Sequence, residues 1–344
     1  MENYDEIRNL LFELAVATGV SGDEDNAAKL AKEKLAQYMP AHIDVLGNVV
    51  GFLEGKGPHI LLDAHVDQIG MIVTAIDDKG FIKFEKCGGS DIRVLAAHEV
   101  SVIGKKVLPG LVISTPPHLS KGEDSQNAKA FDELAVDVGL TKEAVCEIVA
   151  PGDRIILKGE QRQLLGNRVC SPALDDRAGV AAILRCLEIL KAHNHGCALS
   201  VLFSSQEETG GSGAKVGGYK AKADEAIAVD VSFACAPSIP AEKCAKLGGG
   251  TMIGISPVLD RKISKKLENI AKEKGIDYQL EVMGGRTGTN ADSIQNVAEG
   301  VKMGLLSIPL RNMHTAVELV DLHDIECTAR LMAEYILQRG CRNA

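Results

Sequence analysis

The sequence predicts an α/β protein built on a mixed, largely parallel sheet flanked by helices, with a small β-barrel or sandwich domain inserted into it. Residues after 170 alternate between strand-like and helix-like segments, which is typical of a parallel sheet with helices on both faces. Residues 68–160 instead contain short β-rich runs separated by Gly, Pro and polar turns. Because 344 residues exceed what one core usually organises, we expect two domains: a discontinuous α/β domain over 1–67 and 161–344, and an inserted β-rich domain over 68–160.

The amino-terminal part of the α/β domain begins with two predicted helices. Apolar residues at helical spacing predict the first over 4–18. Ser21 and Glu24, spaced as in a capping box, predict a second helix that ends near Tyr38. Short strands are expected to follow at 43–45, 49–53 and 59–64.

The inserted domain and the carboxyl-terminal part follow from the same patterns. Within the insertion, the polar stretch 116–143 predicts a loop with a short helix near Phe131 to Val138. After residue 170 the expected order is helix 176–193, strand 198–204, glycine-rich turn 209–218, strand 226–231, strand 251–255, helix 261–274, strand 278–282, helix 291–297, strand 303–308 and helix 324–339. In such sheets, functional sites gather just past the carboxyl ends of the strands.

Composition and charge exclude several classes of protein. A net charge of -9 argues against nucleic acid or an anionic membrane as partner, because both need a basic surface. The nine cysteines form no CxxC pair, which favours a reducing compartment over a disulfide framework. No stretch approaches the ~20 apolar residues of a membrane span, and the acidic start MENYDEIRNL does not look like a secretory signal. We therefore expect a cytoplasmic protein.

Acidic and imidazole side chains gather at the predicted strand ends. The apolar run in HILLDAHVDQIG leads into His65 and Asp67, which face the same way because side chains alternate along a strand. Other strand or loop ends carry Asp175, Asp176, Glu207, Glu208, Asp230 and His314. Each has an ordinary explanation when taken alone, since an Asp before a helix is usually an N-cap and a loop His is usually solvated.

Taken together, these side chains point to metal binding. The adjacent carboxylates of Glu207 and Glu208 repel each other unless a cation lies nearby, and Asp230 closes a buried-looking strand with no adjacent Lys or Arg. Two His, two Asp and one Glu form a suitable ligand set for two divalent ions such as Zn²⁺ or Co²⁺. Asp175 is then the natural bridging ligand, and Glu207 is free to act as general base.

Five segments in this order, AHVDQIG, SPALDDRAGV, QEETGGSGA, AVDVSFA and NMHT, resemble the signature segments of the M42 family of metallo-aminopeptidases. That family includes glutamyl aminopeptidases, tetrahedral aminopeptidases and proteins once labelled endoglucanase M. The resemblance implies a zinc-peptidase-like catalytic domain and two metal ions, Zn or Co with Mn as a further option. It also implies peptide substrates and a homo-oligomer, with a dodecameric tetrahedral shell as the expected form, in which the insertion makes subunit contacts.

The resemblance also implies residue roles. One metal would be held by His65, Asp175 and Asp230, and the other by Asp175, Glu208 and His314. Glu207 would be the general base, Asp67 would hydrogen-bond the His65 imidazole, and Asp176 would shape the bridging loop. Two positions depart from the family pattern: Gln68 stands where an acid is frequent, and Asn290 replaces a usual Asp in a GTDA-like segment.

Substrate preference and activity class stay open at this stage. Arg311 lies where a basic residue could meet an acidic substrate side chain, whereas an apolar pocket around Met313 and Ile308 would favour Leu or Met. Another metal-dependent amide hydrolase, a deacylase or carboxypeptidase, fits the same ligands. The non-enzymatic alternative is a shell subunit that metal ions stabilise and that has no activity.

Overall fold

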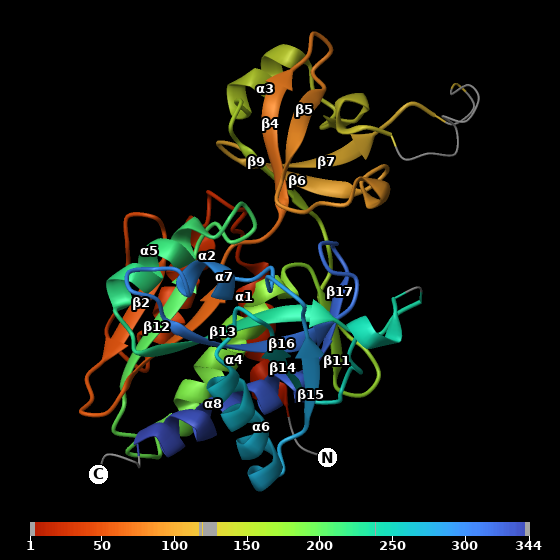
Figure 1. Cartoon of the computed structure of the whole chain (residues 1–344). Helices are drawn as coiled ribbons and strands as arrows, with labels where there is room; N and C mark the ends of the chain where they lie inside the picture. Colours follow the sequence, from red (N-terminus) through yellow and green to blue (C-terminus); the bar gives the residue numbers. More distant parts are fainter. Residues whose placement is uncertain (1–3, 117–118, 120–128, 238, 341–344) are drawn as a thin grey trace.

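The computed structural model describes residues 4–116, 119, 129–237 and 239–340. It confirms the expected fold class, with an α/β body and a β-barrel that stands above it in Figure 1. No helix in the described part of the chain is both long and apolar enough to cross a membrane. All six barrel strands lie within 70–157. The domain boundaries at 67/68 and 160/161 stay a prediction.

The α/β body contains an eight-stranded mixed sheet. Its strand order is β1 (Ala41–Ile43), β2 (Val49–Leu53), β12 (Ala198–Ser204), β3 (His59–His65), β13 (Glu225–Phe233), β16 (Lys302–Leu310), β14 (Thr251–Ile255) and β15 (Tyr278–Val282). The four central strands β12, β3, β13 and β16 are parallel. Their carboxyl ends therefore meet at one edge of the sheet, which is the edge where the candidate site residues lie.

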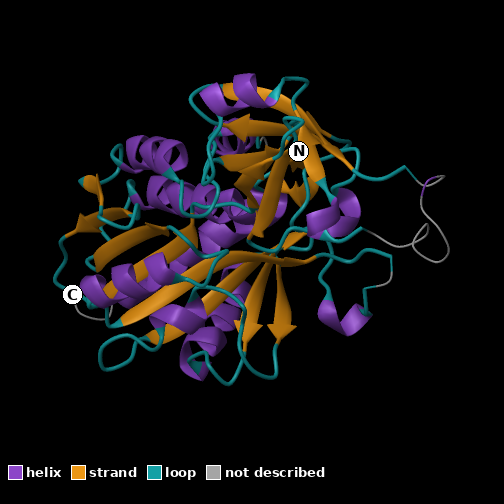
Figure 2. Cartoon of the chain, turned by 90° about the horizontal axis from the view of Figure 1, so that it is seen from above, coloured by secondary structure: helices purple, strands orange, loops and turns teal. Residues whose placement is uncertain are grey.

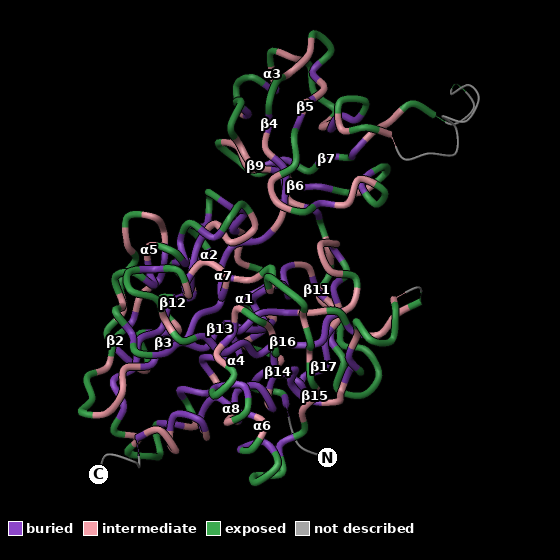
Figure 3. The backbone as a smooth tube through the Cα atoms, viewed as in Figure 1, coloured by how far each residue is buried: buried purple, intermediate pink, exposed green. Residues whose placement is uncertain are grey.

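Helices cover both faces of this sheet, as Figure 2 shows. They are α1 (Asp5–Val16), α2 (Asp25–Leu35), α4 (Leu174–Leu190), α5 (Ser212–Ala221), α6 (Arg261–Lys274), α7 (Ala291–Ile294) and α8 (Leu322–Gly340). The larger core lies on the face covered by α1, α2, α4, α6 and α8. A smaller core lies under α5 and α7 on the opposite face. The central strands between these layers are buried, as the colours of Figure 3 show.

The barrel has its own hydrophobic core. Its strands follow the order β4 (Gly70–Ile76), β5 (Ile82–Cys87), β8 (Ala135–Asp137), β7 (Val107–Ile113), β6 (Glu99–Ile103) and β9 (Arg154–Leu157), and β9 closes on β4. Helix α3 (Lys142–Ile148) and the 3₁₀ turn η1 (Ile92–Val94) belong to the same region. The chain enters the barrel through β4 and leaves through β9, so the two crossings between the bodies lie side by side.

A small antiparallel sheet connects the barrel to the site. It contains β10 (Arg162–Gln163), β11 (Arg168–Ser171) and β17 (Glu318–Asp321). Strand β11 leads directly into the loop that carries Asp175, and β17 follows His314 by four residues. The pairing of β11 with β17 therefore brings these two segments together.

Three expectations for local structure were wrong: the capping box at Ser21 and Glu24, the helix near 131–138 and the glycine-rich turn over 209–218. Ser21 and Glu24 form no capping box: the Ser21 hydroxyl contacts Thr209, and Glu24 accepts from the Gln206 amide at 3.1 Å. The expected helix near 131–138 is a 3₁₀ turn, η4 (Phe131–Glu133), followed by strand β8, because the barrel needs a strand between β5 and β7. Part of the predicted loop, residues 117–118 and 120–128, lies outside the described residues.

The expected glycine-rich turn over 209–218 is mostly helix α5. Its glycines permit a close approach to the sheet, since a Cβ at Gly213 would lie 2.3 Å from the Ser205 carbonyl oxygen and one at Gly217 would lie 2.5 Å from Leu202.

The expectation that the cysteines form no disulfide framework needs correction at one place. Cys235 and Cys244 form a disulfide, because a backbone bridge between their neighbours brings their Cα atoms to 4.9 Å.

Candidate active site

Five chain segments converge at the carboxyl edge of the central strands. His65 ends β3 and Asp230 lies within β13, while Glu207 and Glu208 follow β12. The other two contributions are Asp175, at the start of α4, and His314, which follows β16. The structure therefore brings together all the residues that the sequence proposed as metal ligands, together with Glu207.

The ligand atoms form two overlapping trios that share Asp175. His65, Asp175 and Asp230 make the first, and Asp175, Glu208 and His314 make the second; in each, the atoms lie within 4.8 Å of one another. The two oxygens of Asp175 serve different imidazoles: Oδ1 lies 3.0 Å from His65 Nε2 and Oδ2 lies 3.3 Å from His314 Nε2. This is the arrangement that a carboxylate bridging two cations requires.

The Asp175 segment has the local geometry that this bridging needs. A cis peptide joins Asp175 to Asp176, and both residues have non-helical backbone angles although they stand at the start of α4. The regular helix begins only after them. The kink turns Asp175 toward both imidazoles, while Asp176 lies completely buried beside it.

Asp67 holds the backbone of Glu207 and Glu208 through its carboxylate. Its two oxygens accept from the backbone amides of Glu207 at 3.0 Å and Glu208 at 3.1 Å. The His65 Nδ1 donates to the carbonyl oxygen of Asp67 at 3.1 Å, and the Asp67 carboxylate lies farther from this nitrogen, at 3.5 Å. The predicted partner of His65 is thus correct as a residue, but the shorter contact is with its backbone because its carboxylate is turned toward the two amides.

Glu318 is a site residue that the sequence reasoning missed. It is 2% exposed, and its two oxygens accept from the amides of Asp175 at 3.0 Å and His314 at 2.8 Å. It therefore holds the backbone of both segments that meet in the second trio. Asp176 does the same for His65, whose amide donates to it at 3.3 Å. The sequence shows only an acid four residues after His314, which does not by itself indicate a buried acceptor of backbone amides.

The barrel also contributes to the site. His314 Nδ1 donates to the carbonyl oxygen of Gly89 at 3.2 Å, which leaves Nε2 to face Asp175 and Glu208. A Cβ at Gly89 would lie only 2.4 Å from that Nδ1, so glycine is required for this close approach. Sequence patterns give no signal for a backbone carbonyl that comes from another domain.

Histidines and carboxylates shift each other's pKa strongly here. Burial opposes protonation of His314, but Asp175 and Glu208 outweigh it and raise its pKa to about 11. Burial also favours the neutral acid at Asp175, yet both imidazoles hold the pKa of that carboxyl below its usual range. Burial raises the pKa of Asp230 well above its usual value, and the neighbouring charge of Asp176 adds to this.

Glu207 is more accessible than the buried acids of the site, and its pKa is raised. Its side chain is half-buried, whereas Asp175 and Asp230 are buried. Burial, followed by the charges of neighbouring carboxylates, raises the pKa of Glu207 to about 7 against the opposing effect of His65.

The donor set fits two divalent cations. Acids predominate at the site: seven carboxyl groups gather against the two imidazoles and one buried guanidinium, namely Asp67, Asp175, Asp176, Glu207, Glu208, Asp230 and Glu318 against His65, His314 and Arg177. Burial of so many acids together is costly unless cations compensate it. Imidazole and carboxylate ligands suit Zn²⁺, and equally Co²⁺ or Mn²⁺.

The other residues that the sequence singled out differ in burial and in their contacts. Arg311 is half-buried, and its Nε donates to the Cys235 carbonyl at 2.7 Å. Ile308 is completely buried in the main core, so it cannot line an open pocket; Met313 is half-buried against that core. Asn290 donates to Ser204 Oγ at 2.7 Å beneath the site, and Gln68 pairs through its backbone with Val20.

Comparisons with known proteins identify the family of this chain. Residues 47–331 match the family described as M42 glutamyl aminopeptidase. A lysyl aminopeptidase of Pyrococcus furiosus is 33% identical over 295 residues, which cover 84% of this chain and 84% of that protein. An aminopeptidase structure from the archaeon Desulfurococcus kamchatkensis has a TM-score of 0.92 and 33% identity, and covers 98% of this chain and 96% of that one.

A second solved structure adds information on assembly. The TET1 peptidase of Pyrococcus horikoshii, described as able to assemble into a tetrahedron or a large octahedral shell, has a TM-score of 0.86 and 31% identity. The similarity covers 96% of this chain and 99% of that one. The fold and these relatives define an aminopeptidase, a hydrolase that acts on peptides. Within that class, the chain belongs to the M42 family, as the five sequence segments indicated.

Proposed function

We propose that this chain is a binuclear metal-dependent aminopeptidase with Glu207 as its general base. M42 peptidases depend on metal ions, and the observation that carries the proposal is the pair of trios that share Asp175. His65, Asp175 and Asp230 would hold one ion, and Asp175, Glu208 and His314 the other. The ligand chemistry supports Zn²⁺ or Co²⁺, with Mn²⁺ as the next candidate.

When bound, two such ions lower the pKa of a water molecule and polarise the scissile carbonyl group. The chain's own residues complete the reaction. Glu207 takes the proton of the attacking water and delivers it to the leaving amine. Asp67 holds the backbone of Glu207, so that the base keeps its position relative to the ligands.

Adjacent substitutions of the same kind test these roles. Glu207→Gln removes the base and should lower the hydrolysis of aminoacyl-p-nitroanilides by about 10²–10⁴-fold without changing the metal content. Glu208→Gln removes a ligand and should lower the metal content to about half. Substantial turnover by the metal-loaded Glu207→Gln protein would exclude Glu207 as the base.

Two alternatives are separated by simple measurements. A deacylase or carboxypeptidase would cleave N-acetylated peptides as well as free ones, whereas an aminopeptidase needs the free amine. A shell subunit without activity would bind metal and assemble, but it would hydrolyse no aminoacyl substrate whichever divalent metal is supplied. Glu207 argues against that alternative, because a structural metal site needs ligands and no base.

Assembly and substrate preference extend the proposal. We propose a homo-oligomeric shell, with a dodecamer as the first expectation, supported by the similarity to TET1 and measured by light scattering. For the substrate, we propose that Arg311 favours an acidic first residue. The family description names a glutamyl aminopeptidase, whereas one relative is named a lysyl aminopeptidase. Rates on a panel of aminoacyl substrates, compared between the wild type and Arg311→Ala, decide between acidic and other first residues. Unchanged relative rates on acidic and apolar substrates in that variant would exclude the role.

A further inference from the structure

A second cavity lies at the opposite end of the central strands from the candidate active site. It has a volume of about 610 Å³, within the usual range for small-molecule sites. Strands β13 and β16 begin at this cavity, with Glu225 and Lys302 as paired neighbours. Helix α6 forms one wall, and the last turns of α8 form another, through Tyr335 and Arg339.

The lining of this cavity is strongly basic, in contrast to the chain as a whole. Six of the eleven lining residues are Lys or Arg, and only Glu225 and Asp260 are acidic. The whole chain carries 47 acidic residues against 38 basic ones. A local excess of cations in an acidic protein concentrates anions in the cavity.

Both acids are already engaged. Glu225 is buried and accepts from Arg339 Nε at 2.5 Å. Asp260 caps helix α6 by accepting from the backbone amides of Lys262 at 2.8 Å and Ile263 at 3.0 Å. These contacts hold both acids in place, and the six cations of the lining still outnumber its two carboxylates.

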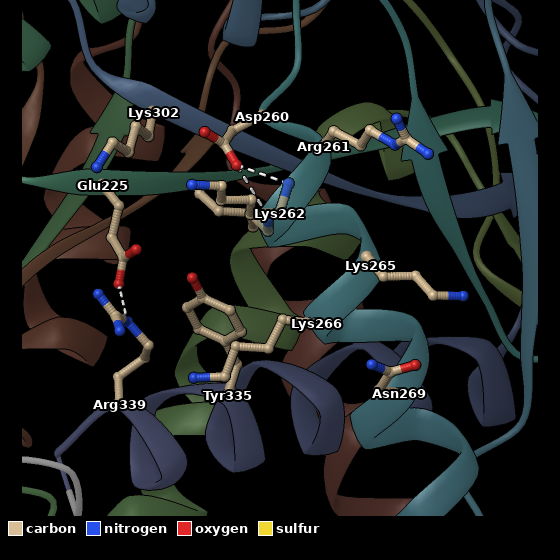
Figure 4. Close-up of a pocket in the computed structure, with 11 residues that line it drawn as sticks. Glu225, Asp260, Arg261, Lys262, Lys265, Lys266, Asn269, Lys302, Tyr335 and Arg339 are labelled. Carbon is tan, nitrogen blue, oxygen red and sulfur yellow. Dashed lines mark hydrogen bonds and ion pairs between the residues drawn. The ribbon is translucent and has the colours of Figure 1, made fainter.

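Two lysines converge on the cavity with no acidic partner. In Figure 4, Lys262 and Lys302 extend toward Glu225 and the Tyr335 hydroxyl, while Arg261 and Lys265 point away. The ion pairs formed by the residues that the structure describes include neither Lys262 nor Lys302. On the inner wall, Lys266 Nζ lies 4.8 Å from the Tyr335 ring centroid, which keeps a further positive charge close by.

We propose that this cavity binds a small phosphate-bearing molecule, a phosphate monoester. Such a group carries close to two negative charges at neutral pH and accepts several hydrogen bonds. Lys262 and Lys302 supply two matching charges, and the buried Tyr335, Ile263 and Glu225 form the floor on which the rest of the ligand would rest. The site is independent of the peptidase chemistry, since it shares no residue with the metal ligands.

The test compares two double variants of the full-length, metal-loaded protein at low ionic strength. Equilibrium dialysis with inorganic phosphate and with glycerol 2-phosphate measures binding to wild type, to Lys262→Gln/Lys302→Gln, and to the control Lys272→Gln/Lys274→Gln. The control also removes two lysine charges, both from the last turn of helix α6, and its lysines pair with Glu268 and Glu334 outside the cavity. Phosphate bound at the metal ions contributes equally to all three proteins.

We expect the cavity variant to bind glycerol 2-phosphate at least about tenfold more weakly, since each lysine contributes a charge-assisted hydrogen bond, while the control binds like wild type. Tighter binding of the ester than of inorganic phosphate shows that the cavity also accepts the organic part. Equal binding of both shows that it recognises phosphate alone. Equal losses in both double variants, or a preference for triglutamate over both phosphates, would overturn the proposal.

Discussion

The substitution Glu318→Gln tests whether the site depends on the backbone contacts of a residue that is not itself a proposed ligand. In the wild type, the two carboxylate oxygens each accept from one amide, that of Asp175 or that of His314. A Gln side chain has one oxygen and one NH₂ group. One of the two buried amides therefore loses its acceptor and faces a donor.

The magnitude follows from that single lost contact. A buried donor without a partner costs about 1–3 kcal/mol, and every 1.4 kcal/mol changes an equilibrium about tenfold. The affected amides belong to Asp175 and His314, which are proposed metal ligands. We therefore expect the lost hydrogen bond to weaken metal binding. The metal concentration needed for half-maximal activity should therefore rise about 10–100-fold, as is typical when a residue that supports a metal ligand is replaced.

The assay titrates the metal-free protein with buffered Zn²⁺ and follows aminoacyl-p-nitroanilide hydrolysis. At saturating metal, we expect kcat within a few-fold of wild type, because Glu207 is intact. Glu326→Gln is the matched control: it makes the same change in a partly buried acid that pairs with Arg185 on α4 and contacts no ligand. Glu318→Asp keeps the charge but shortens the side chain, and it should also weaken metal binding. A Glu318→Asp protein with wild-type affinity would show that charge, and not the amide contacts, explains the effect.

Two further predictions address the barrel contact and the buried acids. Gly89→Ala should reduce activity at least about tenfold by displacing His314, since its Cβ would lie 2.4 Å from Nδ1, whereas Gly284→Ala, with open space around it, should have no effect in the same assay. Burial raises the pKa of both Asp63 and Asp324 to about 7. Their neutral forms are favoured on folding, so this contribution to stability is complete below about pH 4 and is lost as the pH rises through about 7. The melting temperature of the chelated protein should therefore fall between pH 5 and pH 8, and Asp63→Asn should restore on the order of 2–4 kcal/mol at pH 8 but little at pH 5. An equal effect of Asp63→Asn at both pH values would contradict this reasoning.

Much of the fold could be predicted because strong periodicity marks its elements. The segments 251–255, 261–274 and 278–282 were predicted with the bounds that the structure shows. Local patterns failed where tertiary contacts decide. Strand β8 is only three residues long and forms because β5 and β7 need a partner, and α5 forms through glycines whose spacing looks like a turn.

The candidate site shows the same division. His65, Asp175 and Asp230 could be found because acids and imidazoles at strand ends are unusual and parallel strands bring those ends together. The supporting contacts could not, because they depend on backbone atoms. An amide that donates to Glu318, or a carbonyl such as that of Gly89, has no side chain by which a sequence would reveal it.

The barrel's attachment has a consequence for how the protein could be divided. Strands β4 and β9 are hydrogen-bonded neighbours, so the two chain crossings lie about one strand spacing apart, ~4.8 Å. By connectivity alone, the barrel could be cut out and the ends rejoined with a short turn. Chemically it could not, since the excised protein would lose the Gly89 acceptor of His314. The candidate site is thus assembled by both bodies, and a displacement of the barrel relative to the α/β body would reach His314 through its contact with Gly89.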